Sequence, residues 1–307
     1  MKKFKTYLLV LVAILVAVSM LAGCGSDGET EATKAPTAAA TEKPTTAPTQ
    51  APTEAPTEVP TQAPTEAPTE APTKAPITPN DPPEGYNAED KAPAADLFDL
   101  VFDGETAKDN SASQFEITDL NDPIVGEDKE IGKTVADFDK VDASMYAVYD
   151  FNKDVHDKLS DGFTFETYVK LYDDTSYCGI LAYTQSGGAS IDFDEAKGAI
   201  GFGIRSSSGF VYVYDTERVS TDEYYHVVGV YDGESVSLYY DGELIGTSAA
   251  GAIVFPSIEN TYLGVGGDLS DTDQGEDQMT GSIAIARVYS EPLNASQVYN
   301  LYLDAIK

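Results

Sequence analysis

The fold is decided by residues 224–246, which read YYHVVGVYDGESVSLYYDGELIG. Large apolar residues recur here at every second position, a spacing that puts one face of a strand in a core and leaves the other in water. They are Val228, Val230, Val236, Leu238 and Tyr240. The dipeptides Asp232-Gly233 and Asp241-Gly242 tolerate the positive φ angles that tight hairpin turns need. The stretch therefore predicts three antiparallel strands joined by two tight turns.

Three further segments surround this meander. They are GFTFETYV at residues 162–169, QSGG at 185–188, and GSIAIARVY at 281–289 followed by Leu293. The meander itself contributes YHV at 225–227, YDG at 231–233 and LYYDG at 238–242. Together these segments resemble the laminin-G-like, concanavalin A-like jelly-roll family. That family usually has tryptophan at the position of Tyr225. The resemblance covers residues 94–307 and implies an antiparallel sandwich. That family contains lectins, adhesion modules and glycosidases, so the fold alone leaves the function open.

The N-terminus has the layout of a secretory signal. Three lysines in residues 1–5 precede an apolar run at 7–20, which is shorter than the ~20 residues that a membrane-spanning helix needs. The run ends in LAGC at 21–24, which resembles the lipobox of bacterial lipoproteins and implies cleavage before Cys24 and lipidation of that cysteine. An ordinary cleaved signal is the alternative. We expect residues 1–23 to be a lipoprotein signal peptide and the mature protein to be lipid-anchored and extracytoplasmic, at the outer face of the cell membrane.

Residues 24–93 differ in composition from the rest of the chain. Ala-Pro-Thr recurs, with Glu, Gln or Lys between the repeats. Frequent prolines remove backbone donors and favour extended geometry, so this segment cannot form helix or sheet. We expect a disordered Pro/Thr-rich linker, a stalk that spans up to ~200 Å at ~3 Å per residue and whose composition permits O-glycosylation. Disordered filler without a length requirement is the alternative.

Residues 94–307 are long enough to form one domain with a sizeable core. Short apolar segments bounded by Gly, Asp, Asn and Ser predict further strands, as is typical of an all-β, antiparallel β-sandwich. These segments are 97–102, 145–151, 163–171, 178–183, 199–205, 210–214, 261–265 and 282–289. One short C-terminal helix follows, because Asn294 and Gln297 form a capping box ahead of an apolar stripe at Val298, Leu301 and Tyr302. We expect this helix against the sandwich edge.

The chain is strongly acidic, with 52 Asp and Glu residues against 19 Lys and Arg residues and a formal net charge of −33. Such a surface repels phosphate backbones and anionic lipids, so nucleic acid is excluded as a partner and we expect membrane contact through the lipid anchor only. Cations, neutral ligands and basic proteins fit this charge. With Cys24 lipidated, Cys178 lacks a disulfide partner, and its apolar strand predicts a buried, inert thiol.

Few residues offer catalytic chemistry. A glycosidase needs two carboxyl groups roughly 5 to 9 Å apart, and the Glu-x-Asp-x-x-Glu pattern of the glucanases that this fold resembles is absent. Glu166 and Glu223, the nearest strand-associated acids, lack a carboxylate two residues away. His156 and His226 are accompanied by neither Gly-x-Ser-x-Gly nor His-Glu-x-x-His. The sequence predicts a non-catalytic protein in which His226 is a packed strand residue.

Calcium is the candidate cofactor, because it prefers loops dense in carboxylate, amide and carbonyl oxygens. Two loops have that composition. The first contains Asp268, Asp271, Asp273, Glu276 and Asp277, and the second contains Asp103, Asp109 and Asn110. The resemblance implies a structural calcium near the sandwich edge, often with an aspartate in the closing strand, but this strand has alanine at positions 284 and 286.

Tyrosines are the candidate ligand-binding residues. Sugar-binding sandwiches stack aromatic rings on pyranose faces, and the chain has 19 Tyr and no Trp. The candidates are Tyr172, Tyr177, Tyr183, Gln185, Tyr212 and Tyr214, with Tyr239, Tyr262, Asp173, Asp174 and Asn260 as further contributors. Half-buried strand tyrosines are the alternative interpretation. We expect a module that recognises a glycan or glycoconjugate, with a protein-binding module of the cell envelope as the alternative and a glycosidase as the third possibility.

Overall fold

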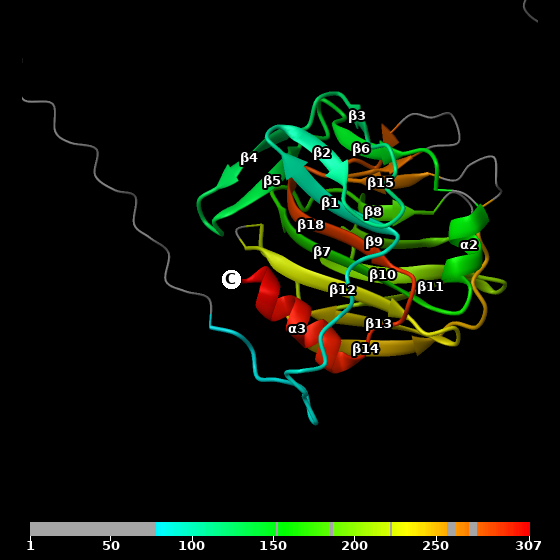
Figure 1. The fold of residues 1–307 in the computed structure, drawn as a ribbon. Helices are drawn as coiled ribbons and strands as arrows, with labels where there is room; N and C mark the ends of the chain where they lie inside the picture. The colour runs from blue at the N-terminus through cyan, green and yellow to red at the C-terminus, as the bar shows by residue number, and fades with distance from the viewer. Residues whose placement is uncertain (1–77, 152, 185–186, 222, 257–261, 270–274) are drawn as a thin grey trace, which may run out of the picture. The chain divides into compact units, whose positions relative to one another are not determined.

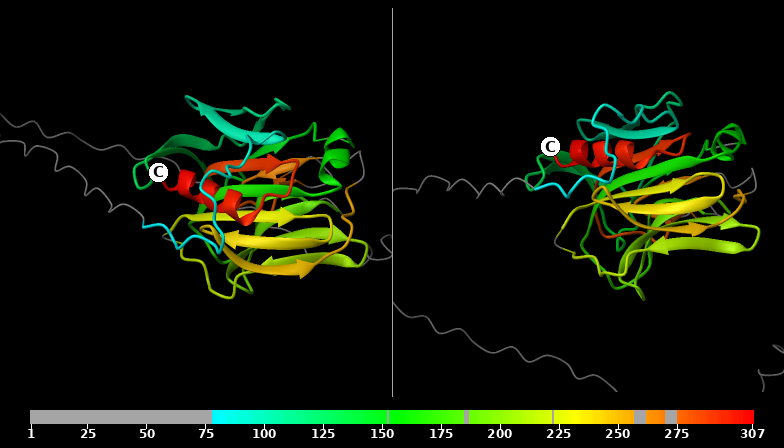
Figure 2. Two further views of the ribbon diagram at one scale, coloured as in Figure 1. Left: turned by 60° about the horizontal axis from the view of Figure 1, so that its bottom comes forward. Right: turned by 90° about the horizontal axis from the view of Figure 1, so that it is seen from below.

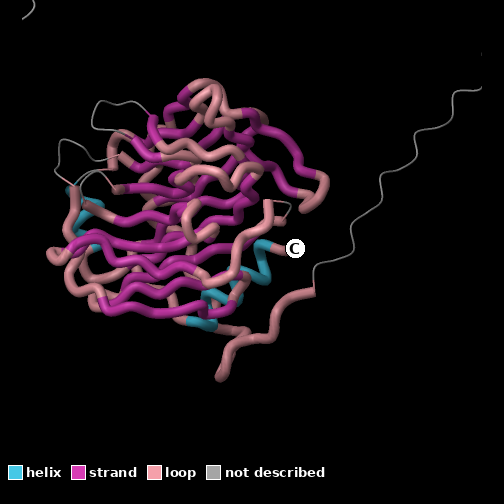
Figure 3. Tube along the Cα trace, turned by 180° about the vertical axis from the view of Figure 1, so that it is seen from behind, coloured by secondary structure: helices cyan, strands magenta, loops and turns pink. Residues whose placement is uncertain are grey.

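The computed structural model describes residues 78–307 except for 152, 185–186, 222, 257–261 and 270–274. In this part of the chain the strands form two large antiparallel sheets and a two-stranded hairpin, packed as a sandwich (Figure 1). The expected all-β sandwich is confirmed. Strands fill the body of the domain and the described helices lie at its margin, as Figure 3 shows from behind.

The first sheet has nine strands in the order β14-β13-β12-β7-β18-β1-β2, with β5 paired to β18 and β4 paired to β5. Its strands are β1 (Phe98–Asp103), β2 (Thr106–Asp109), β4 (Ile124–Asp128), β5 (Lys133–Phe138), β7 (Phe163–Leu171), β12 (Tyr225–Tyr231), β13 (Ser235–Tyr240), β14 (Glu243–Ala249) and β18 (Gly281–Tyr289). The predicted antiparallel meander is confirmed as β12, β13 and β14, and it lies at one end of this sheet.

The second sheet has seven strands in the order β11-β10-β9-β8-β15-β6-β3. They are β3 (Thr118–Leu120), β6 (Met145–Val148), β8 (Cys178–Tyr183), β9 (Ala189–Asp194), β10 (Ala199–Ser206), β11 (Gly209–Tyr214) and β15 (Leu263–Val265). The hairpin of β16 (Asp268–Leu269) and β17 (Gly275–Glu276) lies beside β8. The sequence did not predict β2 to β5, β9, β16, β17 or the short helix α2 (Lys153–Leu159).

The core between the sheets is built from the alternating positions of both. Phe165 of β7 and Phe202 of β10 meet there, with ring centroids 6.1 Å apart. Gly229 of β12 lies under Phe202, and a Cβ at that glycine would stand 2.1 Å from the ring. Cys178 is buried at this core, and burial raises the pKa of its thiol to about 12. The predicted burial of this thiol is confirmed.

The turn at Asp241-Gly242 has the expected geometry, with φ of +46° and +80°, as a two-residue I′ hairpin requires. In the Asp232-Gly233 turn only the glycine has a positive φ. The Asp232 carboxylate instead accepts hydrogen bonds from the backbone N–H groups of Glu234 and Ser235 at 3.0 and 2.7 Å. Both aspartate-glycine dipeptides therefore close hairpins, by different means.

Helix α3 (Ala295–Ala305) begins at the predicted capping box: the Asn294 side chain accepts from the N–H of Gln297, and the Gln297 side chain accepts from the N–H of Asn294. The helix lies over the outer face of the first sheet and not against the sandwich edge (Figures 1 and 2). Its Val298 packs with Val228 and Val230 of β12 in a second apolar cluster. The expectation that β12 has one face in water is therefore wrong, because α3 covers that face.

The N-terminal part of the described chain also lies on this face. We refer to residues 78–93 as the strap. The Tyr86 hydroxyl donates to Asn300 Oδ1 at 2.7 Å, and the Asn87 N–H donates to Ser296 Oγ at 3.0 Å. The Tyr86 and Tyr299 rings meet edge to face, with centroids 4.9 Å apart. Residues that the sequence assigned to the stalk are thus part of the folded domain.

No helix within the described residues combines the length and the apolar character needed to cross a bilayer.

Candidate ligand-binding face

Three of the predicted tyrosines converge on the outer face of the second sheet. Tyr212 and Tyr214 alternate with Val211 and Val213 along the edge strand β11, so both tyrosines point away from the core. Their rings are nearly parallel, 21° apart in orientation, with centroids separated by 5.3 Å. Both side chains are half-buried. We call this stacked pair, together with Tyr177 beside it, the tyrosine face.

A buried carboxylate holds these tyrosines in place. Asp192 of β9 is 0% exposed. Its Oδ1 accepts from the Tyr214 hydroxyl and its Oδ2 from the Tyr177 hydroxyl, both at 3.1 Å. Ser190 Oγ donates to Asp192 Oδ2 at 2.8 Å and lies 2.8 Å from the Tyr212 hydroxyl. The three rings are therefore fixed at their hydroxyl ends by one polar cluster.

Burial dominates the electrostatics of this cluster. It raises the pKa of the Asp192 carboxyl to about 6, while the surrounding hydroxyl donors act in the opposite direction. Burial and the nearby Asp192 charge also raise the pKa of Tyr177, Tyr212 and Tyr214, so the phenols stay protonated and donate. The cluster is a hydrogen-bonded anchor for rings and not a nucleophile.

Two glycines make room for the rings. Gly203 and Gly201 of β10 pair with Tyr212 and Tyr214 across the strands. A Cβ at either glycine would lie 2.4 Å from the Cδ1 atom of the paired tyrosine, well inside van der Waals contact. The rings can therefore lie against β10 only because the sequence has glycine at both positions.

Polar and aromatic groups border the stacked pair. Phe210, which is 46% exposed, lies two residues before Tyr212 on β11, with ring centroids 6.1 Å apart. Arg205 lies over the Phe210 ring at 5.0 Å, and the Lys197 ammonium lies over the Tyr214 ring at 4.2 Å while also pairing with Asp194. An aromatic row with polar groups at both ends thus runs along an edge strand.

The remaining predicted ligand residues lie elsewhere. Tyr183 is buried in the core, where its hydroxyl bonds to His156 Nε2, so no ligand can reach it. Tyr172 follows β7 of the first sheet, and its hydroxyl contacts Asp137 and Ser282. Gln185 lies outside the described residues. The structure therefore brings together Tyr177, Tyr212 and Tyr214 and separates them from Tyr172 and Tyr183.

In the two loops predicted to bind calcium, three described aspartates bond to other groups of the chain. Asp109 is buried and accepts from three backbone N–H groups and from the Ser111 hydroxyl, so its oxygens organise a turn. Asp103 pairs with Lys108. In the other loop, Asp268 accepts from the Thr184 hydroxyl, and burial raises its pKa to about 6. Burial likewise raises the pKa of Asp277.

Asp271 and Asp273 fall outside the described residues. Within the described ranges, no group of three or more His, Cys, Asp or Glu side chains is arranged to hold a metal ion.

A second buried polar cluster lies beneath α3 on the first sheet. Glu166 of β7 is 0% exposed and accepts from the Tyr289 hydroxyl at 2.5 Å, with His226 Nε2 at 3.0 Å and the Arg287 guanidinium at 3.4 Å. Arg287 also donates to Asp99 at 2.7 Å. Despite the cost of its burial, these partners lower the Glu166 pKa below its usual value. The expectation that His226 is a packed strand residue is confirmed.

Asp192, Ser190 and the two glycines are the residues of the tyrosine face that the sequence reasoning missed. The missed strand β9 has a clear signal, since Ala189, Ile191 and Phe193 alternate toward the core. That alternation places Ser190 and Asp192 on the outer face, next to the strand that carries the tyrosines.

Comparison with known proteins agrees with this architecture. A family model described as the concanavalin A-like lectin/glucanases superfamily, Laminin_G_3, matches residues 141–299. A comparison with curated proteins gave no significant match.

Among solved structures, the chain is similar to the binding domain of botulinum neurotoxin DC in complex with SialylT, at 11% identity and a TM-score of 0.54. It is also similar to that domain in complex with rat synaptotagmin II, at 12% identity and a TM-score of 0.54. Both alignments cover 69% of this chain and 52% of the other, so the match spans about half the length of these structures. At this identity the likeness shows a shared fold.

Proposed function

The chain belongs to the concanavalin A-like lectin/glucanase superfamily, and from this premise we propose that its jelly roll is a non-catalytic module that binds carbohydrate or glycoconjugate at the tyrosine face. One observation carries the proposal: Tyr212 and Tyr214 form a stacked, half-exposed pair whose hydroxyl ends are tethered to a buried polar cluster. Aromatic faces of this kind match the C–H faces of pyranose rings.

The tethering supports binding because the rings are ordered before a ligand arrives. A side chain that is already immobile loses little conformational entropy on binding, so more of the contact energy appears as affinity. Arg205, Lys197 and Asp194 at the ends of the row supply donors and acceptors for sugar hydroxyls. The stacked face would provide contact area, and these groups would orient the sugar.

The absence of catalysis is part of the proposal. A glycosidase works with two carboxyl groups that reach the same sugar bond from a cleft. Asp192 and Asp268, whose pKa values are raised to about 6, are both largely buried and held by hydroxyl donors. Glu166 lies beneath α3 with its oxygens engaged by His226 and Tyr289. These three carboxyl groups serve packing in the described domain.

The proposal extends to location and partners. The LAGC segment at 21–24 and the Pro/Thr-rich residues that follow support a module anchored through Cys24 outside the cytoplasm and held away from the membrane. The structures to which the chain is similar were solved with SialylT in one case and with a protein, rat synaptotagmin II, in the other. A glycan is the proposed ligand, and an envelope protein is the alternative.

The test is binding of the purified chain to an array of glycans and cell-wall polysaccharides, with calcium and with chelator. Saturable binding to one saccharide class is expected, and Tyr212→Ala or Tyr214→Ala should weaken it about tenfold or more. Tyr172→Ala is the control, because Tyr172 is also a solvent-accessible tyrosine but follows β7 of the other sheet. Loss of binding in chelator alone would assign calcium to the site. A blank array in both conditions would reject the glycan proposal, and a pull-down from envelope extracts would follow.

A further inference from the structure

The two stacked rings of the tyrosine face lie flat on the sheet, with one face against β10 and the other directed outward. A Cβ at Gly203 would stand 2.4, 2.5 and 2.7 Å from the adjacent ring carbons Cδ1, Cγ and Cε1 of Tyr212. Such nearly equal distances place the glycine beneath the face of the ring and not beyond its edge. Gly201 lies in the same way under Tyr214, at 2.4 Å from both Cδ1 and Cε1. A ligand therefore meets ring faces here, because the hydroxyl ends bond to the buried polar cluster.

Cations lie over the rings on both sides of Tyr212. The Arg205 guanidinium lies over Phe210 at 5.0 Å and the Lys197 ammonium over Tyr214 at 4.2 Å, whereas no described cation lies over Tyr212. The strand register gives the spacing, because Arg205 is opposite Phe210 and the glycine beneath Tyr212 comes two residues earlier on β10. Two residues of a strand span ~7 Å, and alternate residues leave the same face. A sugar on Tyr212 would thus have a cation at either side, within about one pyranose unit.

Arg205 differs from the two other arginines of the chain in its partners. Arg218 pairs with Asp174. Arg287 pairs with Asp99 and with the buried Glu166. Arg205 pairs with no carboxylate of the described residues, although the chain has 52 Asp and Glu residues. A guanidinium presents a planar fork of donors that matches the two oxygens of a carboxylate. The fork of Arg205 is therefore free to bind a carboxylate from outside the chain.

We infer that the ligand of the tyrosine face is an acidic glycan, bound with the ring of a carboxylated pyranose on Tyr212 and its carboxylate on Arg205. This inference rests on the proposed glycan-binding function and adds the class of sugar. The C–H face of the pyranose would cover the outward face of Tyr212. Lys197, which it would share with Asp194, adds a weaker attraction from the other side. Neighbouring sugar units would reach the rings of Phe210 and Tyr214.

The net charge of −33 is compatible with an anionic ligand. At about 0.15 M salt, exposed charges farther away than ~8 Å are largely screened, whereas a cation in contact with the ligand is not. The nearest buried carboxylate of the face, Asp192, is opposite Gly201, four residues from Arg205 along β10. The attraction of Arg205 should therefore outweigh the repulsion from the acidic surface.

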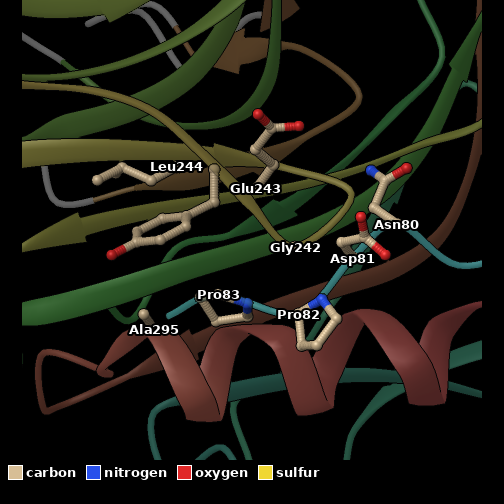
Figure 4. Close-up of a pocket in the computed structure, with 9 residues that line it drawn as sticks. Asn80, Asp81, Pro82, Pro83, Gly242, Glu243, Leu244 and Ala295 are labelled. Atoms are coloured by element: carbon tan, nitrogen blue, oxygen red, sulfur yellow. The ribbon is translucent and has the colours of Figure 1, made fainter. Parts of the chain in front are cut away.

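The cavity at the strap is unsuited to the same ligand. It has a volume of about 540 Å³ and lies between the strap, the β13–β14 turn and the start of α3 (Figure 4). Asn80 Nδ2 donates to the Asp241 carbonyl at 3.1 Å and fastens the strap there. The described residues that line the cavity include Asp81 and Glu243 but no lysine or arginine. An anionic glycan would be repelled from this cavity, so its binding should depend on the tyrosine face.

The experiment compares matched ligands by calorimetry of the purified chain at about 0.15 M salt. Each pair consists of a linear, equatorially linked trisaccharide of glucose or of mannose and its uronate counterpart, in which every CH₂OH group is replaced by a carboxylate. The uronate form of at least one pair should bind about fivefold tighter than the neutral form. Neutral forms that bind as tightly as the uronates, or more tightly, would overturn this inference and leave the proposed function standing. Absence of binding by both forms of both pairs would count against both proposals.

Variants test whether Arg205 is the source of the preference. In Arg205→Gln the ratio of the uronate affinity to the neutral affinity should fall to about one, and Arg205→Lys, which keeps the charge without the fork, should retain part of it. Lys129→Gln removes one positive charge from the exposed β4–β5 turn of the first sheet and is the matched control, with the wild-type ratio expected. An equal fall of the ratio in Arg205→Gln and Lys129→Gln would indicate general electrostatic attraction and would overturn the assignment to Arg205. Melting temperatures would verify that each variant is folded.

Discussion

Replacing Asp192 with asparagine should remove a specific part of the pH dependence of stability. The Asp192 pKa is raised from 3.8 to about 6 in the folded chain, so folding favours the protonated carboxyl. Its contribution to the free energy of unfolding is therefore fully present below pH 3.8 and is lost as the pH rises through about 6. A difference of about two pKa units at ~1.4 kcal/mol each corresponds to ~3 kcal/mol.

Asparagine keeps the shape of the side chain and cannot ionise. Its amide oxygen can accept from Tyr214 or Tyr177, and hydroxyl groups can rotate to accept from its NH₂ group. The unfolding free energy of Asp192→Asn minus that of the wild type should therefore rise by most of this amount, ~2 kcal/mol, between pH 4 and about pH 7. All other acidic groups cancel in this difference, including Asp268, whose pKa is also raised to about 6.

The assay is urea unfolding of the purified wild type and variant at half-unit pH steps, followed by tyrosine fluorescence. Asp194→Asn, two residues further along β9, is the control: the hydrogen bond and ion pair with Lys197 lower the Asp194 pKa below 3.8, so its pH dependence has the opposite sign, lies below about pH 4 and leaves the difference nearly constant from there to pH 7. A constant difference between Asp192→Asn and the wild type across this pH range would refute the argument that the Asp192 carboxylate is destabilised by burial.

Two further substitutions test the packing. Gly203→Ala should lower the unfolding free energy by ~1–3 kcal/mol and displace Tyr212, because the new methyl group would stand 2.4 Å from the ring. Gly126→Ala in β4 is the control and should be tolerated, because a Cβ there has nothing within 4 Å. Equal unfolding free energies of the two variants in urea would contradict this prediction. Glu166→Ala should lower the unfolding free energy by ~3–5 kcal/mol, because His226 and Arg287 would lose the buried carboxylate that both contact. Tyr289→Phe removes one hydrogen-bond donor to Glu166 and should lower it less. A larger loss of thermal stability in Tyr289→Phe than in Glu166→Ala would contradict the assignment of Glu166 as the centre of this cluster.

The sequence was most informative where one face of a strand packs on a core. β7 and β8 have the predicted bounds, and the capping box of α3 has the predicted bonds, because local spacing determines both. β4 was missed since it is largely exposed and has no apolar alternation to detect. The sequence also could not show that α3 covers β12, because that contact joins segments about 70 residues apart along the chain.

Only part of the candidate site could be predicted, because the sequence shows residue types but not the contacts between separate strands. Residue type identified Tyr177, Tyr212 and Tyr214, but the reason they lie together is Asp192, which binds two of them from a different strand. The strap was assigned to the stalk because it continues the proline-containing composition of the preceding segment, with prolines at positions 79, 82, 83 and 93. Its contacts depend on Tyr86 and Asn87, whose roles become visible only when α3 is in place.

The strap also determines how the domain would respond to mechanical tension. A force applied through residue 78 meets the Asn80 bonds to Asp241 and Tyr299 first, and then the contacts of Tyr86 with Asn300, before it reaches β1. These bonds join the strap to the C-terminal helix and to the β13–β14 turn of the first sheet. The rings of the tyrosine face stand on the other sheet, outside this load path. A domain under tension would therefore yield first at its strap, with the second sheet and its tyrosine face still folded.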